Sequence, residues 1–217
     1  MGASNKRDFR LIMYGIDGSG KTSILKLLEK ILDEDEKKRL KEQVKEDKKK
    51  KSEKKTEKEK EEEEKEKEKK SKNYIPTIGF NVIDIKYEKY HFTIWDVGGQ
   101  DKIRILWKHY YSNVDGIIYV LDSNDSDKFE ENKETFEKLI NEDELKKQPI
   151  LIYANKQDMN GAYSENDIIE KLEMKKYTDR KWLVKGTSIN NGEGIKEGFD
   201  WLISSMINKN EKGIITK

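Results

Sequence analysis

The chain has 217 residues, with 45 basic and 44 acidic side chains and a formal net charge of +1. This length suits one domain with additions, and the balanced charge argues against a nucleic-acid binder, which normally carries a basic excess on one face. Cysteine is absent, which excludes disulfides and thiolate metal sites, and no apolar run approaches membrane-spanning length. We therefore expect a protein that is either cytoplasmic or peripheral on intracellular membranes.

Residues 1–8 form a short polar tail that begins Met-Gly. The myristoylation pattern M-G-x-x-x-[ST] requires Ser or Thr at position 6, where this chain has Lys6. A fortuitous Met-Gly start and a lipidation signal at Gly2 therefore both stay open.

A phosphate-binding loop is predicted next. Residues 9–14 form an apolar run typical of a buried strand, and the apolar residues of 24–32 have the spacing of an amphipathic helix. Between them, residues 15–22 fit the pattern G-x-x-x-x-G-K-[ST], whose glycines let backbone N–H groups surround phosphate oxygens at a helix N-terminus. Lys21 should reach the β- and γ-phosphates, and the Thr22 hydroxyl should ligate Mg²⁺. The residues expected to contact the phosphates are Gly15, Asp17, Gly18, Ser19, Gly20, Lys21, Thr22 and Ser23.

Residues 33–72 interrupt the domain with a Lys/Glu-rich low-complexity insertion. They hold 18 basic and 16 acidic side chains in 40 positions, too polar to contribute to a core. We expect an insertion that extends from the first helix, partly helical and partly disordered. It is either a solvated segment or an element that binds a partner or a membrane surface. Its balanced charge argues against membrane binding, because anionic lipids attract clusters of basic residues.

The remaining chain predicts a mostly parallel sheet. Alternating apolar residues in 83–87 and 91–95 indicate a hairpin, and unbroken apolar runs at 116–122 and 149–154 indicate strands covered on both faces. Helices are expected around 129–140, 168–172 and 199–206, with a last strand near 182–184. This order predicts an α/β doubly wound sheet with one antiparallel edge strand, in which ligands bind at the carboxyl ends of the strands.

Two motifs follow predicted strands and indicate the ligand. Asp96-Val97-Gly98-Gly99-Gln100 ends the hairpin, where a P-loop enzyme holds its Mg²⁺ shell and senses the γ-phosphate. Asn155-Lys156-Gln157-Asp158 ends the strand at 149–154. The Asp158 carboxylate can accept both guanine N1–H and N2–H, whereas adenine lacks these donors. Asn155 can hold guanine N7 and tie down the phosphate loop, and the Lys156 stem can pack on the purine ring.

Together these stretches resemble the ADP-ribosylation factor (Arf and Arf-like) family of small GTPases. The resemblance covers residues 9–32 and 73–207. Its most specific stretches are Pro76-Thr77-Ile78-Gly79-Phe80-Asn81-Val82, residues 95–104 from Trp95 to Arg104, and Leu106-Trp107-Lys108-His109-Tyr110-Tyr111. The resemblance implies a P-loop small-GTPase fold with a mostly parallel six-stranded sheet, helices on both faces and one antiparallel edge strand. The GTPase domain would span 9–207, and 208–217 would be a polar tail.

The resemblance also implies roles for individual residues. Thr77 would join Mg²⁺ only in the GTP state, Asp96 would hold Mg²⁺ through water, and the Gly99 N–H would contact the γ-phosphate. Gln100 would orient the attacking water, so the catalytic residues expected are Gln100, Lys21 and Thr77. The metal ligands expected are Thr22, Thr77 and Asp96. Ser188 and Ile189 stand in the family's guanine loop, where the backbone N–H of Ile189 would contact guanine O6.

Partners follow from the same resemblance. Phe80, Trp95 and Tyr110 match the aromatic trio that binds effectors, although a core role for Trp95 is the alternative. The hairpin at 82–94 would shift register between nucleotide states. No arginine in the motifs is an evident cis finger, so an activating protein is expected to supply one, and an exchange factor to release GDP.

Several departures bear on the function. The family commonly has an amphipathic helix before the first strand, which couples GTP binding to membrane insertion. Only eight residues precede Phe9 here, too few for three helical turns, so this coupling to a membrane is in doubt. We expect a GTP/GDP-regulated switch with slow hydrolysis that binds effectors in the GTP state and acts in membrane or vesicle trafficking. The alternative is a GTP-dependent scaffold with negligible hydrolysis. A kinase or ATPase is disfavoured by residues 155–158.

Overall fold

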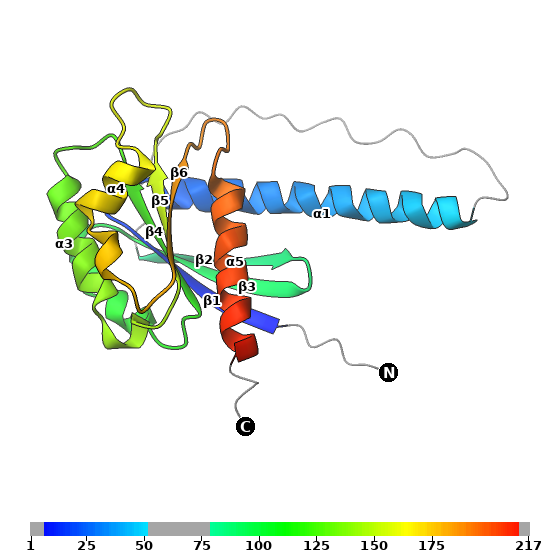
Figure 1. The fold of residues 1–217 in the computed structure, drawn as a ribbon, viewed down its shortest axis with the longest axis horizontal. Helices are drawn as coiled ribbons and strands as arrows, with labels where there is room; N and C mark the ends of the chain where they lie inside the picture. Colours follow the sequence, from blue (N-terminus) through cyan, green and yellow to red (C-terminus); the bar gives the residue numbers. More distant parts are fainter. Residues whose placement is uncertain (1–6, 52–78, 213–217) are drawn as a thin grey trace.

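The computed structural model describes residues 7–51 and 79–212, which fold around a six-stranded sheet (Figure 1). The strand order is β2-β3-β1-β4-β5-β6. β1 pairs in parallel with β3 and β4, and β5 pairs in parallel with β4 and β6. β2 alone among these strands is antiparallel, with Phe80 opposite Val97 and Tyr87 opposite Tyr90. The predicted six-stranded sheet with one antiparallel edge strand is confirmed. The strands are β1 (Arg7–Tyr14), β2 (Phe80–Tyr87), β3 (Tyr90–Val97), β4 (Gly116–Asp122), β5 (Ile150–Asn155) and β6 (Trp182–Thr187).

Helices cover both faces of the sheet. α3 (Phe129–Ile140) and α4 (Glu165–Lys171) pack on one face, and α1 (Lys21–Lys51) and α5 (Ile195–Lys212) pack on the other. Every residue of β4 and β5 is buried, which explains why their sequences are unbroken apolar runs. β2 lies at the edge and buries only Ile85 and Tyr87 fully, so its sequence alternates.

α1 continues well beyond its buried part. Its residues Ile24, Leu25, Leu28 and Leu32 are fully buried, whereas Leu40 is 54% exposed. The predicted insertion therefore begins inside a continuous helix that reaches Lys51, and residues 52–72 lie outside the described residues. Figure 1 shows this helix projecting past the sheet. α5 likewise continues to Lys212, past the predicted domain end at 207.

Short helices complete the fold at the ends of strands. α2 (Asp101–Arg104) and the 3₁₀ helix η1 (Trp107–Tyr110) follow β3, in a stretch for which we predicted no element. η2 (Asp143–Leu145) follows α3, and η3 (Met174–Lys176) follows α4. Within the described residues, no helix is both long enough and apolar enough to cross a membrane.

Candidate nucleotide-binding site

The phosphate loop lies between β1 and α1, as the sequence predicts. Gly15, Asp17, Gly18, Ser19 and Gly20 form the turn, and Lys21, Thr22 and Ser23 open α1. Two glycines are required by close packing: a Cβ on Gly15 would collide with the carbonyl oxygen of Val120, and one on Gly20 with the side-chain amide of Asn155. Both also have a positive φ, of +147° and +97°, which side chains rarely adopt.

The Lys21 ammonium lies inside this turn. Its Nζ donates to the carbonyl oxygens of Gly15 and Ile16, each at 2.9 Å, and the residue is 6% exposed. Burial lowers the pKa of Lys21 to about 8, and the carboxylates of Asp96 and Asp17 oppose this effect. Among the described residues the hydrogen-bond partners of this buried cation are the two carbonyl oxygens, so an anionic phosphate at this place would stabilise the charged form further.

Asp96 faces Thr22 across the loop. Its Oδ2 accepts a hydrogen bond of 2.5 Å from the Thr22 hydroxyl, whereas its buried Oδ1 has no hydrogen-bond partner among the described residues. Burial raises the pKa of Asp96, against the hydrogen bond from Thr22 and the charge of Lys21. A hydroxyl oxygen beside a carboxylate with an unused buried oxygen fits a hard cation such as Mg²⁺, which prefers oxygen ligands.

Gly99 packs directly on the phosphate loop. A Cβ there would lie less than 3.0 Å from the Gly15 oxygen, the Ile16 carbonyl carbon and Lys21 Nζ. Gln100 follows as the residue before the first turn of α2. It lines a cavity of about 290 Å³ together with residues of the phosphate loop, α2, α3 and the position before α3, namely Ile16, Asp17, Asp101, Arg104, Glu131 and Lys128. The structure thus brings Gly99 and Gln100 to the predicted phosphate site.

The residues predicted to bind guanine gather on the other side of the loop. Asn155 is fully buried, donates from Nδ2 to the Ser19 carbonyl at 2.9 Å and accepts from the Thr187 hydroxyl at 3.3 Å. It therefore ties the phosphate loop to β5 and β6. Lys156, in a left-handed conformation, forms an ion pair with Asp122 at the end of β4.

Asp158 is exposed and joined to the loop after β6. Hydrogen bonds from Ser188 and Asn190 lower its pKa, and the bond from Asn190 is 2.5 Å long. Ile189 places its Cδ1 3.1 Å from where a Cβ of Gly20 would be. The motifs that follow β1, β3, β5 and β6 therefore meet at one end of the sheet.

The model of the ADP-ribosylation factor family matches residues 64–206, about two thirds of the chain. The chain belongs to the ADP-ribosylation factor family. It is thus a small GTPase, and family membership implies that it binds guanine nucleotide. The fold agrees with the solved structure of the Arl6 (BBS3) small GTPase from Trypanosoma brucei with the bound nucleotide analogue GppNp. The TM-score is 0.69 at 24% sequence identity, over 93% of this chain and 98% of that one.

In this Arf-family chain the predicted aromatic trio forms a compact triangle. Ring centroids of Phe80 and Trp95 lie 5.2 Å apart, those of Phe80 and Tyr110 5.4 Å, and those of Trp95 and Tyr110 5.5 Å. Phe80 is 49% exposed, whereas Trp95 is half-buried and packs against the core. Trp95 thus contacts both the core and the exposed ring of Phe80. Thr77 lies outside the described residues.

Three further residues of the Arf-family site received no role from the sequence. Asp122 pairs with Lys156, Asn190 supports Asp158, and Arg104 binds the carbonyl of Gly99. A role in the site could have been predicted for Asp122, because it ends an apolar strand in the same way as Asp96. The role of Arg104 could not have been predicted from the sequence, because its partner on α3, Glu131, is 27 residues away along the chain.

Proposed function

We propose that this chain is a GTP/GDP-regulated molecular switch that binds effectors in its GTP state. The observation that supports this most directly is the packing of Gly99 on the phosphate loop, beside Lys21 Nζ. A terminal phosphate held by Lys21 would lie next to the Gly99 backbone. The presence or absence of this phosphate would therefore change the conformation of the segment that continues into Gln100 and α2.

The nucleotide contacts that we propose follow the geometry of the loops. The backbone of residues 15–23 and Lys21 would hold the phosphates, with Gly99 contributing its N–H to the γ-phosphate. Asp158 would accept the guanine N–H donors, Lys156 would pack on the ring, and Ile189 would donate its backbone N–H to O6. The lowered pKa of Asp158 supports its role, because only the carboxylate form can accept both donors.

Thr22 and Asp96, together with Thr77, would hold Mg²⁺. When bound, this ion neutralises charge on the β- and γ-phosphate oxygens. The unpartnered Oδ1 of Asp96 is the feature of the described residues that supports the assignment.

Hydrolysis would depend on Gln100, Lys21 and Thr77. Gln100 would orient the attacking water, while Lys21 would stabilise the charge on the phosphoryl group in the transition state. We expect slow intrinsic turnover, because Arg104 is committed to other partners and cannot serve as a cis arginine finger. An activating protein would then supply the missing arginine.

Effectors, the exchange factor and the activating protein would contact the surface around the aromatic trio. Val82, which is opposite Trp95 in the sheet, is exposed and apolar, and so are Ile105 and Leu106, which directly precede the 3₁₀ helix that carries Tyr110. This part of the surface therefore suits a protein partner. We place the protein in the cytoplasm, peripheral on intracellular membranes, and in membrane or vesicle trafficking. Acylation of Gly2 stays an open prediction because residues 1–6 lie outside the described residues.

Bound-nucleotide analysis together with tryptophan fluorescence tests this proposal. The purified protein should contain GDP or GTP, and replacing GDP by a non-hydrolysable GTP analogue should change the emission of Trp95. A Trp95→Phe variant assigns the signal, because the chain has three other tryptophans. Bound guanine nucleotide without a spectral change, and without hydrolysis in the presence of candidate activators, would favour a GTP-dependent scaffold instead. Absence of guanine nucleotide would refute both.

A further inference from the structure

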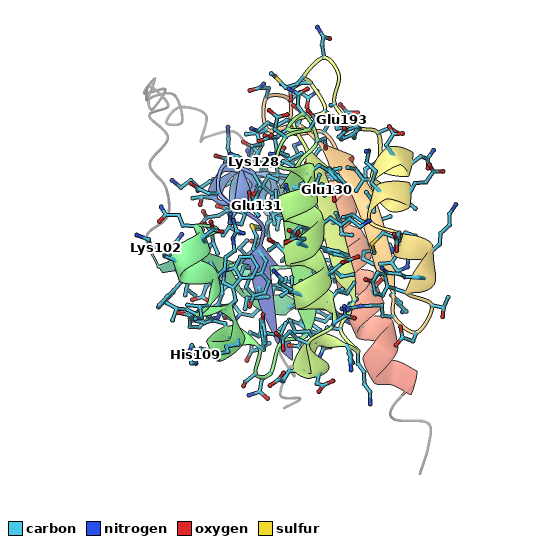
Figure 2. All side chains as sticks on the ribbon, turned by 90° about the vertical axis from the view of Figure 1, so that its left-hand side faces the viewer. Lys102, His109, Lys128, Glu130, Glu131 and Glu193 are labelled. Carbon is cyan, nitrogen blue, oxygen red and sulfur yellow. The ribbon has the colours of Figure 1, made fainter. Side chains whose placement is uncertain are left out.

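Arg104 connects the phosphate-sensing segment to α3. It ends α2, its side chain is only 17% exposed, and its Nε donates to the carbonyl oxygen of Gly99 at 2.8 Å. Its two terminal nitrogens reach Glu131 on α3 at 2.5 Å and Thr135, one turn further along α3, at 3.2 Å. Asp101 pairs with the same guanidinium at 2.9 Å. In Figure 2 the end of α3 that carries Glu131 lies close to α2, which carries Lys102.

These bonds fix the peptide that joins Gly99 to Gln100. The Gly99 carbonyl is held by Arg104, and the preceding carbonyl, that of Gly98, accepts from the buried Trp107 indole at 3.0 Å. On its other side Gly99 is confined by the phosphate loop. The carbonyl of Gln100 accepts hydrogen bonds from the backbone N–H groups of Ile103 and Arg104, which form the first turn of α2 directly after Gln100. Arg104 is therefore one of the groups that fix the path by which the chain leaves the phosphate loop at Gln100, and it is the one that links this path to α3.

α3 provides a firm anchor for this arrangement. On the side facing the sheet, α3 buries Phe136 and Leu139 almost completely, so the helix is fixed to the core. Glu131 and Thr135 lie on the same helix, one turn apart, and their side chains fit the planar fork of a guanidinium. A lysine could not reach Gly99, Glu131 and Thr135 at once, because its ammonium is a single point of contact.

We propose that Arg104 is a positioning residue for GTP hydrolysis, which holds the Gly99–Gln100 peptide against the phosphate loop by bridging it to Glu131 on α3. Arg104 acts through Gln100 and does not touch the reacting atoms itself. This inference rests on the proposed function, because it presupposes that the chain hydrolyses GTP with Gln100.

Single-turnover hydrolysis of preloaded GTP in the full chain tests the inference, alongside GDP dissociation and thermal unfolding. Arg104→Ala should lower the hydrolysis rate about 10- to 100-fold, the loss expected when a catalytic group is misplaced by about 1 Å. GDP should dissociate from it at the wild-type rate. The hydrolysis rate of Arg104→Lys should be close to that of Arg104→Ala. Glu131→Gln should also hydrolyse GTP more slowly than wild type, but with a smaller loss of rate.

Matched controls come from the same two helices. Lys102→Gln and Glu130→Gln change exposed charged neighbours on α2 and α3, and both should hydrolyse GTP at the wild-type rate. If Arg104→Ala does not fold, the hydrolysis rate of Glu131→Gln tests the positioning role instead, because glutamine retains the shape of the glutamate side chain.

Three results would overturn the inference, and each points to a different failure. Arg104 and Glu131 variants that hydrolyse GTP as fast as wild type would refute the positioning role alone. A wild-type protein that binds guanine nucleotide but hydrolyses none, even with activators, would remove the proposed hydrolysis as well. An equal loss of GDP binding and hydrolysis would show that Arg104 only supports the fold.

Discussion

Replacing Gly99 by alanine should weaken binding of GTP selectively. Gly99 packs so closely on the phosphate loop that a Cβ would lie less than 3.0 Å from Gly15, Ile16 and Lys21 Nζ. Two of these neighbours are backbone atoms, which cannot move aside as the end of a side chain can. Gly99→Ala should therefore push this segment off the loop.

The size of the effect follows from the cost of overpacking. Inserting one carbon into a filled site typically costs about 1–3 kcal/mol, which corresponds to about a 5- to 150-fold change in an equilibrium constant. Only the GTP state needs Gly99 against the loop, since the proposed contact is with the γ-phosphate. The affinity for a non-hydrolysable GTP analogue should fall by this factor, while GDP affinity stays nearly unchanged.

Titration with fluorescent GDP and with a fluorescent non-hydrolysable GTP analogue measures both affinities. Gly116→Ala is the matched control. Its Cβ would meet the side chains of Met206, Leu11 and Leu202 at 2.9–3.2 Å in the core, so it should lower stability without changing nucleotide preference. If Gly99→Ala keeps the wild-type ratio of the two affinities, the contact between Gly99 and the loop does not select for the γ-phosphate, and the argument fails.

Three further predictions concern stability. Arg180, 8% exposed, donates to the carbonyls of residues 140, 145 and 148, so Arg180→Met should lower the free energy of unfolding by about 2–3 kcal/mol in denaturant titrations. Arg39 pairs with Glu88 at the surface, so Arg39→Ala should cost at most about 1 kcal/mol, and less at high salt, in the same assay. The pKa of Asp158 is lower in the folded protein than in the unfolded chain, so its stabilisation is present above the unfolded value of about 3.9 and is lost as the pH falls through the folded value. Asn190→Ala should therefore raise the pH at which the protein unfolds in an acid titration; an unchanged midpoint would mean that the hydrogen bond from Asn190 does not hold the carboxylate.

The order of elements and most of the site could be predicted because the signals are local. An apolar run followed by a polar motif defines each strand end, and parallel strands bring these ends together, which is why Asp96 and Asn155 could be expected near Lys21. The pairing of Arg104 with Glu131 could not be predicted, since it depends on how α2 sits beside α3. The continuation of α1 to Lys51 was only partly predicted, because a Lys/Glu-rich sequence suits a solvated helix and a disordered chain equally well.

The length of α1 has a mechanical consequence. Its first residue, Lys21, lies in the phosphate loop, and Arg39, 18 residues later, contacts Glu88 in the turn between β2 and β3. At a rise of 1.5 Å per residue these two points are about 27 Å apart, joined by one continuous helix instead of a loop. A helix hardly stretches, so any displacement of the hairpin relative to the phosphate loop must break the Arg39 contact or tilt α1 as a whole. The 12 residues of helix beyond Arg39 would amplify such a tilt, and since the chain has no cysteine, one introduced there could carry a single spectroscopic label that reports it.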